Sequence, residues 1–244
     1  GAKNTNFTSP HGLDNEKHYT TAYDLALITK EALKNEVFSN IVKTKTISCS
    51  GRFFANTNPL LGVVDGIDGV KTGFTNNAGK CIVLTAIRND MRIIIVLLGC
   101  PDSNSRITDG KRLTEFIFNE YSIYNLFPAN QLVGTAHIEK NKTPPADLYS
   151  TYSPIYPLTE EEYANISITL VISNTTYHFN NGFYADISLD KNTKAGEIIG
   201  NIIISAEDKL LAKIPVILIS DVTRKNFNDF LKDVFYELIW TTFC

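Results

Sequence analysis

Two long apolar runs that follow each other directly restrict the fold of this chain more than any other feature. The runs Lys80–Arg88 and Met91–Gly99 are rich in Ile, Val and Leu, and only Asn89 and Asp90 separate them. β-Branched residues favour strands, and a two-residue polar spacer is typical of a tight hairpin. Because both runs are almost continuously apolar, we expect an antiparallel sheet with helices on both faces, which is an α+β fold.

Two stretches have the spacing of helices that pack on such a core. From Thr20 to Lys34 apolar residues recur on one face, and Thr21 followed by Asp24 predicts a capping box. From Ser105 to Tyr124 apolar residues again recur at helical spacing after a polar start. We interpret the first of these helices as structural and the second as a cover for the hairpin.

Further short strands are expected in the first half of the chain. Asn40–Ser50 and Phe53–Asn56 flank a Ser-Gly turn, and Val63–Val70 is an extended apolar run. The residues that follow Val70 are Lys71-Thr72-Gly73, and turn-forming residues come soon after them. The tripeptide is therefore predicted to lie on a strand that is about to reverse.

The Lys-Thr-Gly tripeptide places a cation, a hydroxyl and an unhindered backbone position on this strand. Side chains alternate along a strand, so Lys71 and Gly73 face one way and Thr72 the other. Gly73 also allows a ligand to approach the backbone closely. This pattern predicts a site for an anionic ligand. Such a tripeptide also occurs by chance at ordinary strand ends, so its surroundings must support the interpretation.

Several strings around the tripeptide point to one family. They are Asn4-Thr5, Ser9-Pro10-His11-Gly12-Leu13-Asp14, Thr21-Ala22-Tyr23-Asp24-Leu25-Ala26, Asn56-Thr57-Asn58 and Gly69-Val70-Lys71-Thr72-Gly73-Phe74-Thr75. With these strings nearly the whole chain resembles the serine-type D-alanyl-D-alanine carboxypeptidases, which are low-molecular-mass penicillin-binding proteins of the peptidase S11 type. The resemblance implies that the chain holds the C-terminal portion of a transpeptidase-like domain, in which K-T-G lies on the edge strand of the active site.

The resemblance also implies roles for individual residues. Lys71 and Thr72 would hold the carboxylate of the substrate, and the backbone N–H of Phe74, after Gly73, would be one oxyanion-hole donor. Arg106 would add a second cation, or be a surface residue at a helix start. His11 lies in a loop and is either a surface residue or a direct participant. No metal or cofactor is implied.

The nucleophile of that family is not found where it should be. Ahead of Lys71 the chain has neither the S-x-x-K motif nor the S-x-N motif, and we predict that both motifs, and with them the catalytic serine, are absent from this chain. The chain also begins with Gly1 where the family would already be past both motifs. We therefore expect the C-terminal part of a longer protein, inactive when isolated.

The resemblance leads to two alternatives for function. In the first, the parent protein trims the terminal D-alanine of peptidoglycan pentapeptides through an acyl-enzyme and is inhibited by β-lactams, at the extracytoplasmic face of the bacterial cell membrane. In the second, the chain is a non-catalytic relic or regulatory module that keeps the peptide-binding edge. The sequence upstream of Gly1 would distinguish the two.

Charge and cysteine content exclude other classes. The net charge of -3 and the pI near 5.8 come without a basic stripe, so we expect no nucleic-acid partner. The four cysteines lack the spacing of metal ligands, and they imply no disulfide framework; they are Cys49, Cys81, Cys100 and Cys244.

The pattern changes after a Pro- and Asn-containing stretch, where we place a domain boundary. We expect a catalytic-domain portion at residues 1–127 and a small β-rich domain at residues 128–220. Period-two strands are predicted at Ala164–Ile172, Thr176–Phe179, Phe183–Leu189, Ile198–Ser205 and Leu210–Leu218. Within this domain His178 is interpreted as an ordinary strand residue and Glu160–Glu162 as a solvated loop.

The final segment, residues 221–244, is predicted to be an amphipathic helix. Its apolar residues recur at helical spacing, namely Val222, Phe227, Phe230, Leu231, Val234, Phe235, Leu238, Ile239 and Phe243. One alternative is packing on the β-rich domain. The other, which the resemblance implies and Trp240 suits, is a helix in the membrane interface.

Overall fold

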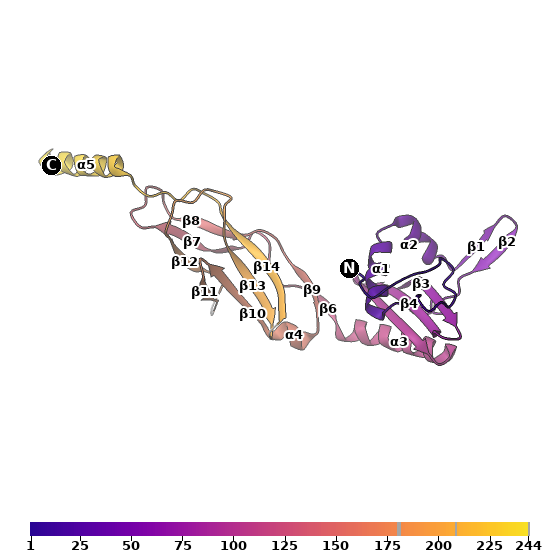
Figure 1. Ribbon diagram of the computed structural model, residues 1–244. Coiled ribbons are helices and arrows are strands. Elements are labelled where there is room, and N and C mark those ends of the chain that lie inside the picture. Colours follow the sequence, from indigo (N-terminus) through magenta and orange to yellow (C-terminus); the bar gives the residue numbers. More distant parts are fainter. Residues whose placement is uncertain (180–181, 208, 244) are drawn as a thin grey trace. The chain divides into compact units, whose positions relative to one another are not determined.

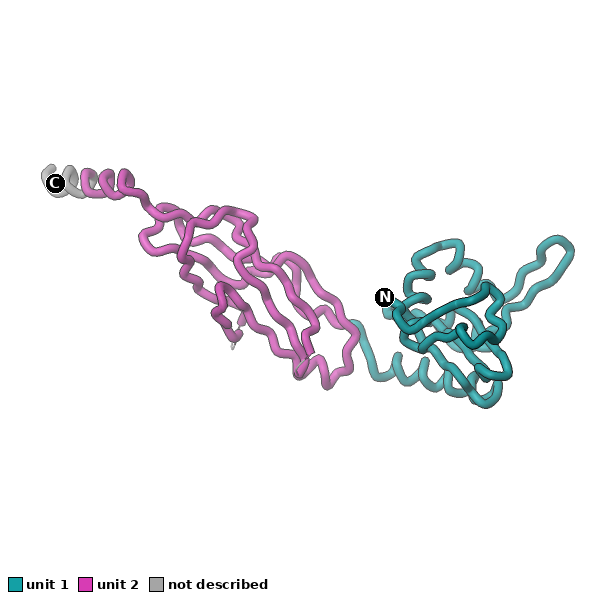
Figure 2. Tube along the Cα trace, viewed as in Figure 1, with its two compact units in different colours: residues 1–123 teal, residues 124–244 magenta. Residues whose placement is uncertain are grey.

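The computed structural model describes residues 1–179, 182–207 and 209–243, and it describes no side chains beyond Phe235. The chain divides into two compact units, Gly1–Ile123 and Tyr124–Cys244, which Figure 2 shows in different colours. Each unit contains its own cluster of buried apolar residues. The two units are therefore described separately.

The first unit is a three-stranded antiparallel sheet with helices and a separate hairpin (Figure 1). Its sheet has the order β3-β4-β5, so β3 is an edge strand. Its elements are α1 (Ala22–Ala32), α2 (Glu36–Val42), β1 (Thr46–Cys49), β2 (Arg52–Ala55), β3 (Ile67–Thr75), β4 (Gly79–Arg88), β5 (Met91–Cys100) and α3 (Ser103–Glu120).

The predicted hairpin is confirmed as β4 and β5, with Asn89 and Asp90 at positive φ in the turn. Alternation along β4 separates two faces. On one face Ile82 and Leu84, each 1% exposed, pack with residues of α3. On the other face Val42 of α2 lies against β3, and α1 packs on β5. Helices therefore cover both faces, as the apolar runs required.

α3 is tied to the sheet by a paired arginine. The guanidinium of Arg88 on β4 donates to both carboxylate oxygens of Glu115, at 3.0 and 2.9 Å. This hydrogen bonding lowers the pKa of Glu115 below its ordinary value. A bidentate pair has a fixed orientation, so it sets the position of the helix against the end of the hairpin.

Two strand predictions in the first unit are wrong in part. Asn40–Val42 belong to α2 and not to a strand, because the Asn35 side chain accepts from Phe38 N and starts a helix there. The strand predicted from Val63 begins only at Ile67, since Gly62 and Gly66 have φ of 72° and 76°, which a strand does not contain.

The helix ends also differ from the expected ones. Thr21 caps α1 as predicted, because its side chain accepts from Asp24 N. The Asp24 carboxylate does not complete the capping box, since it binds other backbone and side-chain groups. α3 begins two residues early because Asp102 accepts from Ser105 N, and it ends at Glu120 instead of Tyr124.

The second unit is built on a seven-stranded sheet of order β11-β10-β13-β14-β8-β7-β12 (Figure 1). β12 pairs with β7 in parallel, and the other described pairs of this sheet are antiparallel. The strands of the sheet are β7 (Leu132–Ile138), β8 (Ala146–Ser150), β10 (Ile166–Ile172), β11 (Thr175–His178), β12 (Ala185–Leu189), β13 (Ile198–Ala206) and β14 (Lys209–Leu218). Outside it lie β6 (Ser122–Asn125), β9 (Ile155–Leu158), α4 (Glu160–Ala164) and α5 (Phe227–Phe243).

Corrections in this unit concern its boundary, one loop and the last helix. Phe127, which was expected to close the first domain, is 1% exposed in the core of the second unit. Glu160–Glu162 form the start of α4, capped by Thr159 in a complete capping box, and they are solvent-exposed. His178 is an exposed strand residue, as predicted.

The last helix begins later than predicted. Val222 is fully buried in the β-sheet core, where its backbone pairs with Thr193, so it does not belong to the helix. α5 starts at Phe227, and Phe227, Val234 and Phe235 are 75%, 52% and 62% exposed. The predicted face also included Leu238, Ile239, Trp240 and Phe243, whose side chains lie outside the described ones, as does Cys244. In the described part of the chain no helix is both long and apolar enough to cross a membrane.

Candidate functional site

A cavity of about 1280 Å³ lies in the first unit between β3 and the N-terminal loop. One wall is the edge strand β3 with the turn after it, and the opposite wall is the segment from Phe7 to Thr20. Its described lining residues are Phe7, Thr8, Ser9, Pro10, His11, Gly12, Asp14, His18, Tyr19, Thr20, Leu25, Lys71, Thr72, Gly73, Phe74, Thr75, Ala78, Cys81, Leu98 and Gly99.

The K-T-G residues occupy the β3 wall of the cavity. Thr72 Oγ1 lies 2.7 Å from Thr57 Oγ1, and a Cβ added at Gly73 would be 3.7 Å from Cys81 Cβ, so the strand surface is open there. Lys71 is exposed, and among the described residues no carboxylate lies within salt-bridge distance of it. Its Nζ donates to the backbone carbonyl of Thr72, and its charge is not balanced by an acid of this described region, so it can attract an anion.

Phe74 adds an aromatic surface beside this cation. Its ring is 56% exposed, and the ammonium of Lys80, its partner on β4, lies 3.3 Å from the ring centroid. This contact is a cation–π interaction and holds the ring over the strand end. Together, Lys71 and Lys80 place two positive charges on the same strand pair.

The loop wall is closed at its base by backbone pairing. Asn6 and Tyr19 exchange two backbone hydrogen bonds of 2.9 and 3.0 Å. Beside this bridge the carboxylate of Asp24, which is 1% exposed, accepts from Asn4 N at 2.6 Å and from Thr5 Oγ1 at 2.8 Å. Asp24 lies in the first turn of α1, where a negative charge also interacts favourably with the helix dipole. The helix therefore anchors the loop.

His11 is brought to the same cavity as the K-T-G strand. Its Nδ1 accepts from Leu13 N at 3.1 Å and lies 3.2 Å from Ser9 Oγ, and the adjacent Gly12 has a φ of 71°. Because Nδ1 accepts, the proton of the neutral ring is on Nε2. His11 can therefore present an N–H donor to a ligand.

Arg106 is not among the residues that line the cavity. It is 9% exposed, and its Nη1 donates to the carbonyl of Cys81 at 3.1 Å, so the alternative of a surface residue is wrong. Arg106 lies in the first turn of α3, and the N-cap residue Asp102 fixes where this helix starts. The hydrogen bonds that Asp102 accepts from Ser105 lower its pKa. Arg106 supports the strand behind the cavity wall; contact with a substrate carboxylate stays a prediction.

Sequence reasoning missed several lining residues. His18, Tyr19 and Cys81 line the cavity, yet no motif marked them. Cys81 lies on β4, within the predicted apolar strand, and is half-buried; with Cys49 and Cys100 it is a free thiol. His18 reaches the cavity only because the Asn6–Tyr19 bridge folds the loop back, and such pairing between distant residues leaves no local pattern.

The prediction that the chain lacks an S-x-x-K motif is wrong, because the second unit contains this spacing. Ser188 and Lys191 have this spacing, but Ser188 lies on β12, and Lys191 Nζ lies 3.7 Å from a Glu197 oxygen. Residues three apart approach each other on a helix, whereas here Ser188 lies on a strand that ends at Leu189 and Lys191 lies beyond it. The spacing at Ser188 therefore does not create an activated serine.

The fold matches part of the fold of solved penicillin-binding proteins. Penicillin binding protein 5 from Haemophilus influenzae superposes with a TM-score of 0.67 at 23% identity, covering 92% of this chain and 62% of that one. The D-alanyl-D-alanine carboxypeptidase DacD from Francisella tularensis gives 0.65 at 23% identity, covering 92% and 65%. At these identities the comparison establishes the fold alone.

The sequence comparisons find relatives of one kind. Residues 1–102 match the peptidase S11 family model, described as D-alanyl-D-alanine carboxypeptidase, which confirms the resemblance. The chain is 30% identical over 250 residues to the D-alanyl-D-alanine carboxypeptidase DacF of Bacillus subtilis, with all of this chain and 60% of that protein covered. It is thus similar to these enzymes over its whole length but spans little more than half of theirs.

Proposed function

We propose that the first unit is the carboxylate-binding side of a serine-type D-Ala-D-Ala carboxypeptidase, which removes the terminal D-alanine of peptidoglycan pentapeptides through an acyl-enzyme. The observation that carries this proposal is the cavity that joins Lys71–Phe74 on the edge strand with His11 on the loop. The match of residues 1–102 to the peptidase S11 family model supports the same reaction, the removal of a terminal D-alanine.

The chemistry of such a reaction needs three functions. A hydroxyl must be activated, the substrate's terminal carboxylate must be held, and negative charge on the carbonyl oxygen must be stabilised. In this chain the ammonium of Lys71 and the hydroxyl of Thr72 hold the carboxylate. The nucleophilic serine belongs to sequence outside this chain.

Other groups on the cavity wall complete the binding of the peptide. The backbone N–H of Phe74 stabilises the oxyanion, and loss of one such donor costs about 3–4 kcal/mol of the barrier in related chemistry. The Nε2–H of His11 donates to the peptide from the loop wall. Arg106 acts at a distance by holding the Cys81 segment, which lies opposite Gly73 in the sheet.

The location and inhibitors follow from the same proposal. The whole protein works on the extracytoplasmic face of the bacterial cell membrane and is acylated by β-lactams. α5 lies in the membrane interface through its exposed aromatic face, which includes Phe227, Phe230 and Phe235. The first turns of α5 contact the second unit through the Lys142–Asp229 pair, but Phe227, Val234 and Phe235 stay exposed, and this apolar surface supports the placement.

The test compares two ligands on the 244-residue chain. N-acetyl-D-Ala-D-Ala and its C-terminal amide differ only in the carboxylate, so the acid should bind about tenfold more tightly if one ion pair distinguishes them. Lys71→Ala should abolish this difference, because it removes the cation. Lys30→Ala, which removes an exposed lysine of α1, is the matched control and should preserve the difference.

A second arm addresses acylation. A fluorescent penicillin should leave no covalent band on the isolated chain after denaturing electrophoresis, since the nucleophile is not part of it. A covalent band would refute that statement. Equal binding of the acid and the amide by the unmodified chain would remove Lys71 from the carboxylate site. Binding of the acid with no acylation, even in a full-length protein, would favour the regulatory alternative.

A further inference from the structure

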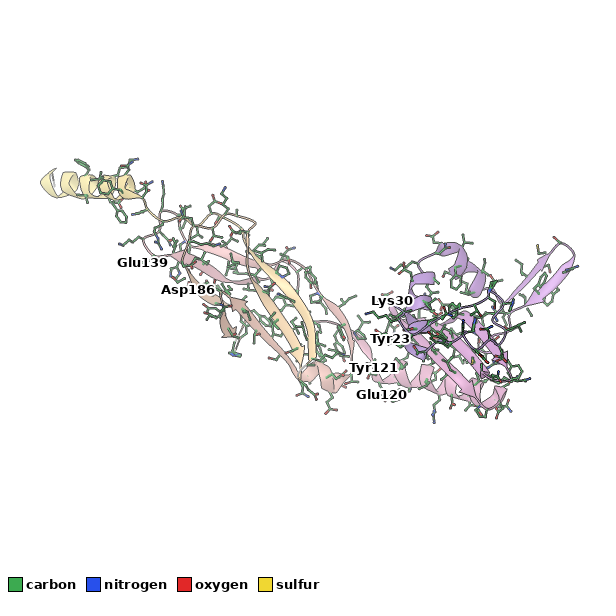
Figure 3. All side chains as sticks on the ribbon, in the orientation of Figure 1. Tyr23, Lys30, Glu120, Tyr121, Glu139 and Asp186 are labelled. Carbon is green, nitrogen blue, oxygen red and sulfur yellow. The ribbon has the colours of Figure 1, made fainter. Side chains whose placement is uncertain are left out.

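A hydrogen-bonded cluster of side chains lies on the solvent-exposed face of the β7–β12 pair in the second unit. The parallel pair β7 and β12 places Asp186 opposite Thr135 and Ser188 opposite His137. The alternate residues of β12, Ala185 and Ile187, are 7% and 1% exposed and belong to the core. The register therefore fixes the polar side chains on the solvent side (Figure 3, where Asp186 is labelled).

Four side chains of this face form a continuous network. Asp186 Oδ1 accepts from Thr135 Oγ1 at 3.3 Å and from His137 Nδ1 at 3.1 Å. Tyr184 Oη lies 3.3 Å from Thr135 Oγ1. Because a carboxylate only accepts, His137 must carry its proton on Nδ1 when it makes this bond. The network holds each of the four side chains in one orientation, which lowers the entropy cost of binding a ligand.

The network leaves a defined set of groups open to solvent. Asp186 Oδ2 is in none of the described hydrogen bonds, and the side chain is 68% exposed. In the neutral ring of His137 the Nε2 lone pair is an outward acceptor. Tyr184 is 59% exposed and presents a flat apolar ring beside these acceptors. The face therefore offers two acceptors and one aromatic surface.

These groups match one class of ligand. A pyranose has hydroxyl donors along its edge and an apolar C–H face, so its hydroxyls pair with Asp186 and His137 while its ring lies on Tyr184. We propose that the β7–β12 face is a carbohydrate-binding site. The polymer that it takes is the glycan strand that carries the stem peptides; this last identification rests on the function proposed above.

Other uses of the cluster fit the observations less well. Ser188, His137 and Asp186 are the residue types of a catalytic triad, but no described hydrogen bond joins Ser188 to His137, so no nucleophile is activated. Among the described residues no group of three or more His, Cys, Asp or Glu side chains is arranged to hold a metal ion. The acceptors are thus free for hydroxyl donors.

The experiment is a titration of the full 244-residue chain with a soluble tetramer of N-acetylglucosamine, followed by NMR. Tyr184→Ala should weaken binding about tenfold or more, because it removes the aromatic surface. Asp186→Asn should weaken it severalfold, whereas Tyr184→Phe should retain most of it. Tyr23→Ala removes a tyrosine of the first unit that is 72% exposed and serves as the matched control. Because the tetramer is uncharged, we expect its affinity for the chain to be the same at low and high salt.

Two results would overturn the carbohydrate site: no binding of the tetramer, or equal binding by the unmodified chain and Tyr184→Ala. The outcome of this titration can be distinguished from the outcome of the peptide-binding experiment. Lys71→Ala should bind the tetramer normally, and Tyr184→Ala should bind N-acetyl-D-Ala-D-Ala normally. Loss of tetramer binding with peptide binding intact would refute only the inference about β7 and β12. The reverse result would refute only the function proposed for the first unit.

Discussion

Asp24 is the residue whose removal should reveal how the cavity is held open. Its buried carboxylate accepts two hydrogen bonds from the N-terminal segment, from Asn4 N and Thr5 Oγ1. Both bonds lie beside the Asn6–Tyr19 bridge that closes the loop wall. We therefore predict that Asp24→Ala destabilises the first unit and loosens the loop that carries His11.

The size of the effect follows from the two contacts. Hydrogen bonds to a charged group contribute about 1.5–3 kcal/mol each, so Asp24→Ala should cost about 4 kcal/mol. For a unit of this size that loss lowers Tm by about 10 °C or more. Asp24→Asn keeps an acceptor but loses the charge, and it should cost about half as much, since charge-assisted bonds are roughly twice as strong as neutral ones.

Thermal unfolding and amide hydrogen exchange measure the two consequences. Glu16→Ala is the control, because Glu16 is an exposed acid of the same loop. Exchange at Asn6 and Tyr19 should become faster in Asp24→Ala and stay unchanged in Glu16→Ala. If Asp24→Ala and Glu16→Ala unfold within a degree of the unmodified chain, the buried carboxylate does not anchor the loop.

Three further predictions concern a helix cap, a strand and the last helix. The hydrogen bonds from Ser105 lower the pKa of Asp102, so the ionised carboxylate stabilises the fold above about pH 4 and this stabilisation is lost as the pH falls further. The unmodified chain should therefore have a higher Tm than Asp102→Asn at neutral pH, and this difference should vanish on acidification. A difference in Tm that does not change with pH would refute this. Gly134→Ala should prevent folding of the second unit, because its Cβ would lie 1.9 Å from the Ala185 carbonyl oxygen; native-like circular dichroism would contradict it. Deletion of residues 227–244 should abolish liposome sedimentation. The binding should persist at high salt, because the segment has one basic and three acidic side chains and is therefore not held by attraction to anionic lipid; equal sedimentation would exclude an α5 anchor.

The parts of the fold that depend on local pattern were predictable from the sequence. The hairpin required only the two apolar runs and the spacer between them, and Thr21 starts α1 through a bond to a residue three positions away. Predictions failed where contacts between distant residues, or the backbone conformation of a single residue, determine the local structure. Gly66 has a positive φ inside the apolar run Val63–Val70, so the strand begins only at Ile67. The Asp24 carboxylate binds residues about twenty positions upstream instead of its own helix start.

In the candidate site, too, residue spacing in the sequence was informative only where the secondary structure was known. The flanking residues predicted that the K-T-G tripeptide lies on a strand, and it does, on β3; Lys71, Thr72 and Gly73 all line the cavity there. Ser188 and Lys191 have the spacing of a catalytic pair, but Ser188 lies on β12 and Lys191 lies beyond its end beside Glu197, so no helix brings the two side chains together. Ser188 instead joins Tyr184 and Asp186 on one face of β12, which gives that strand a binding surface. A motif therefore has chemical meaning only with the secondary structure that holds it, and the same three-residue spacing on a helix would imply a nucleophile.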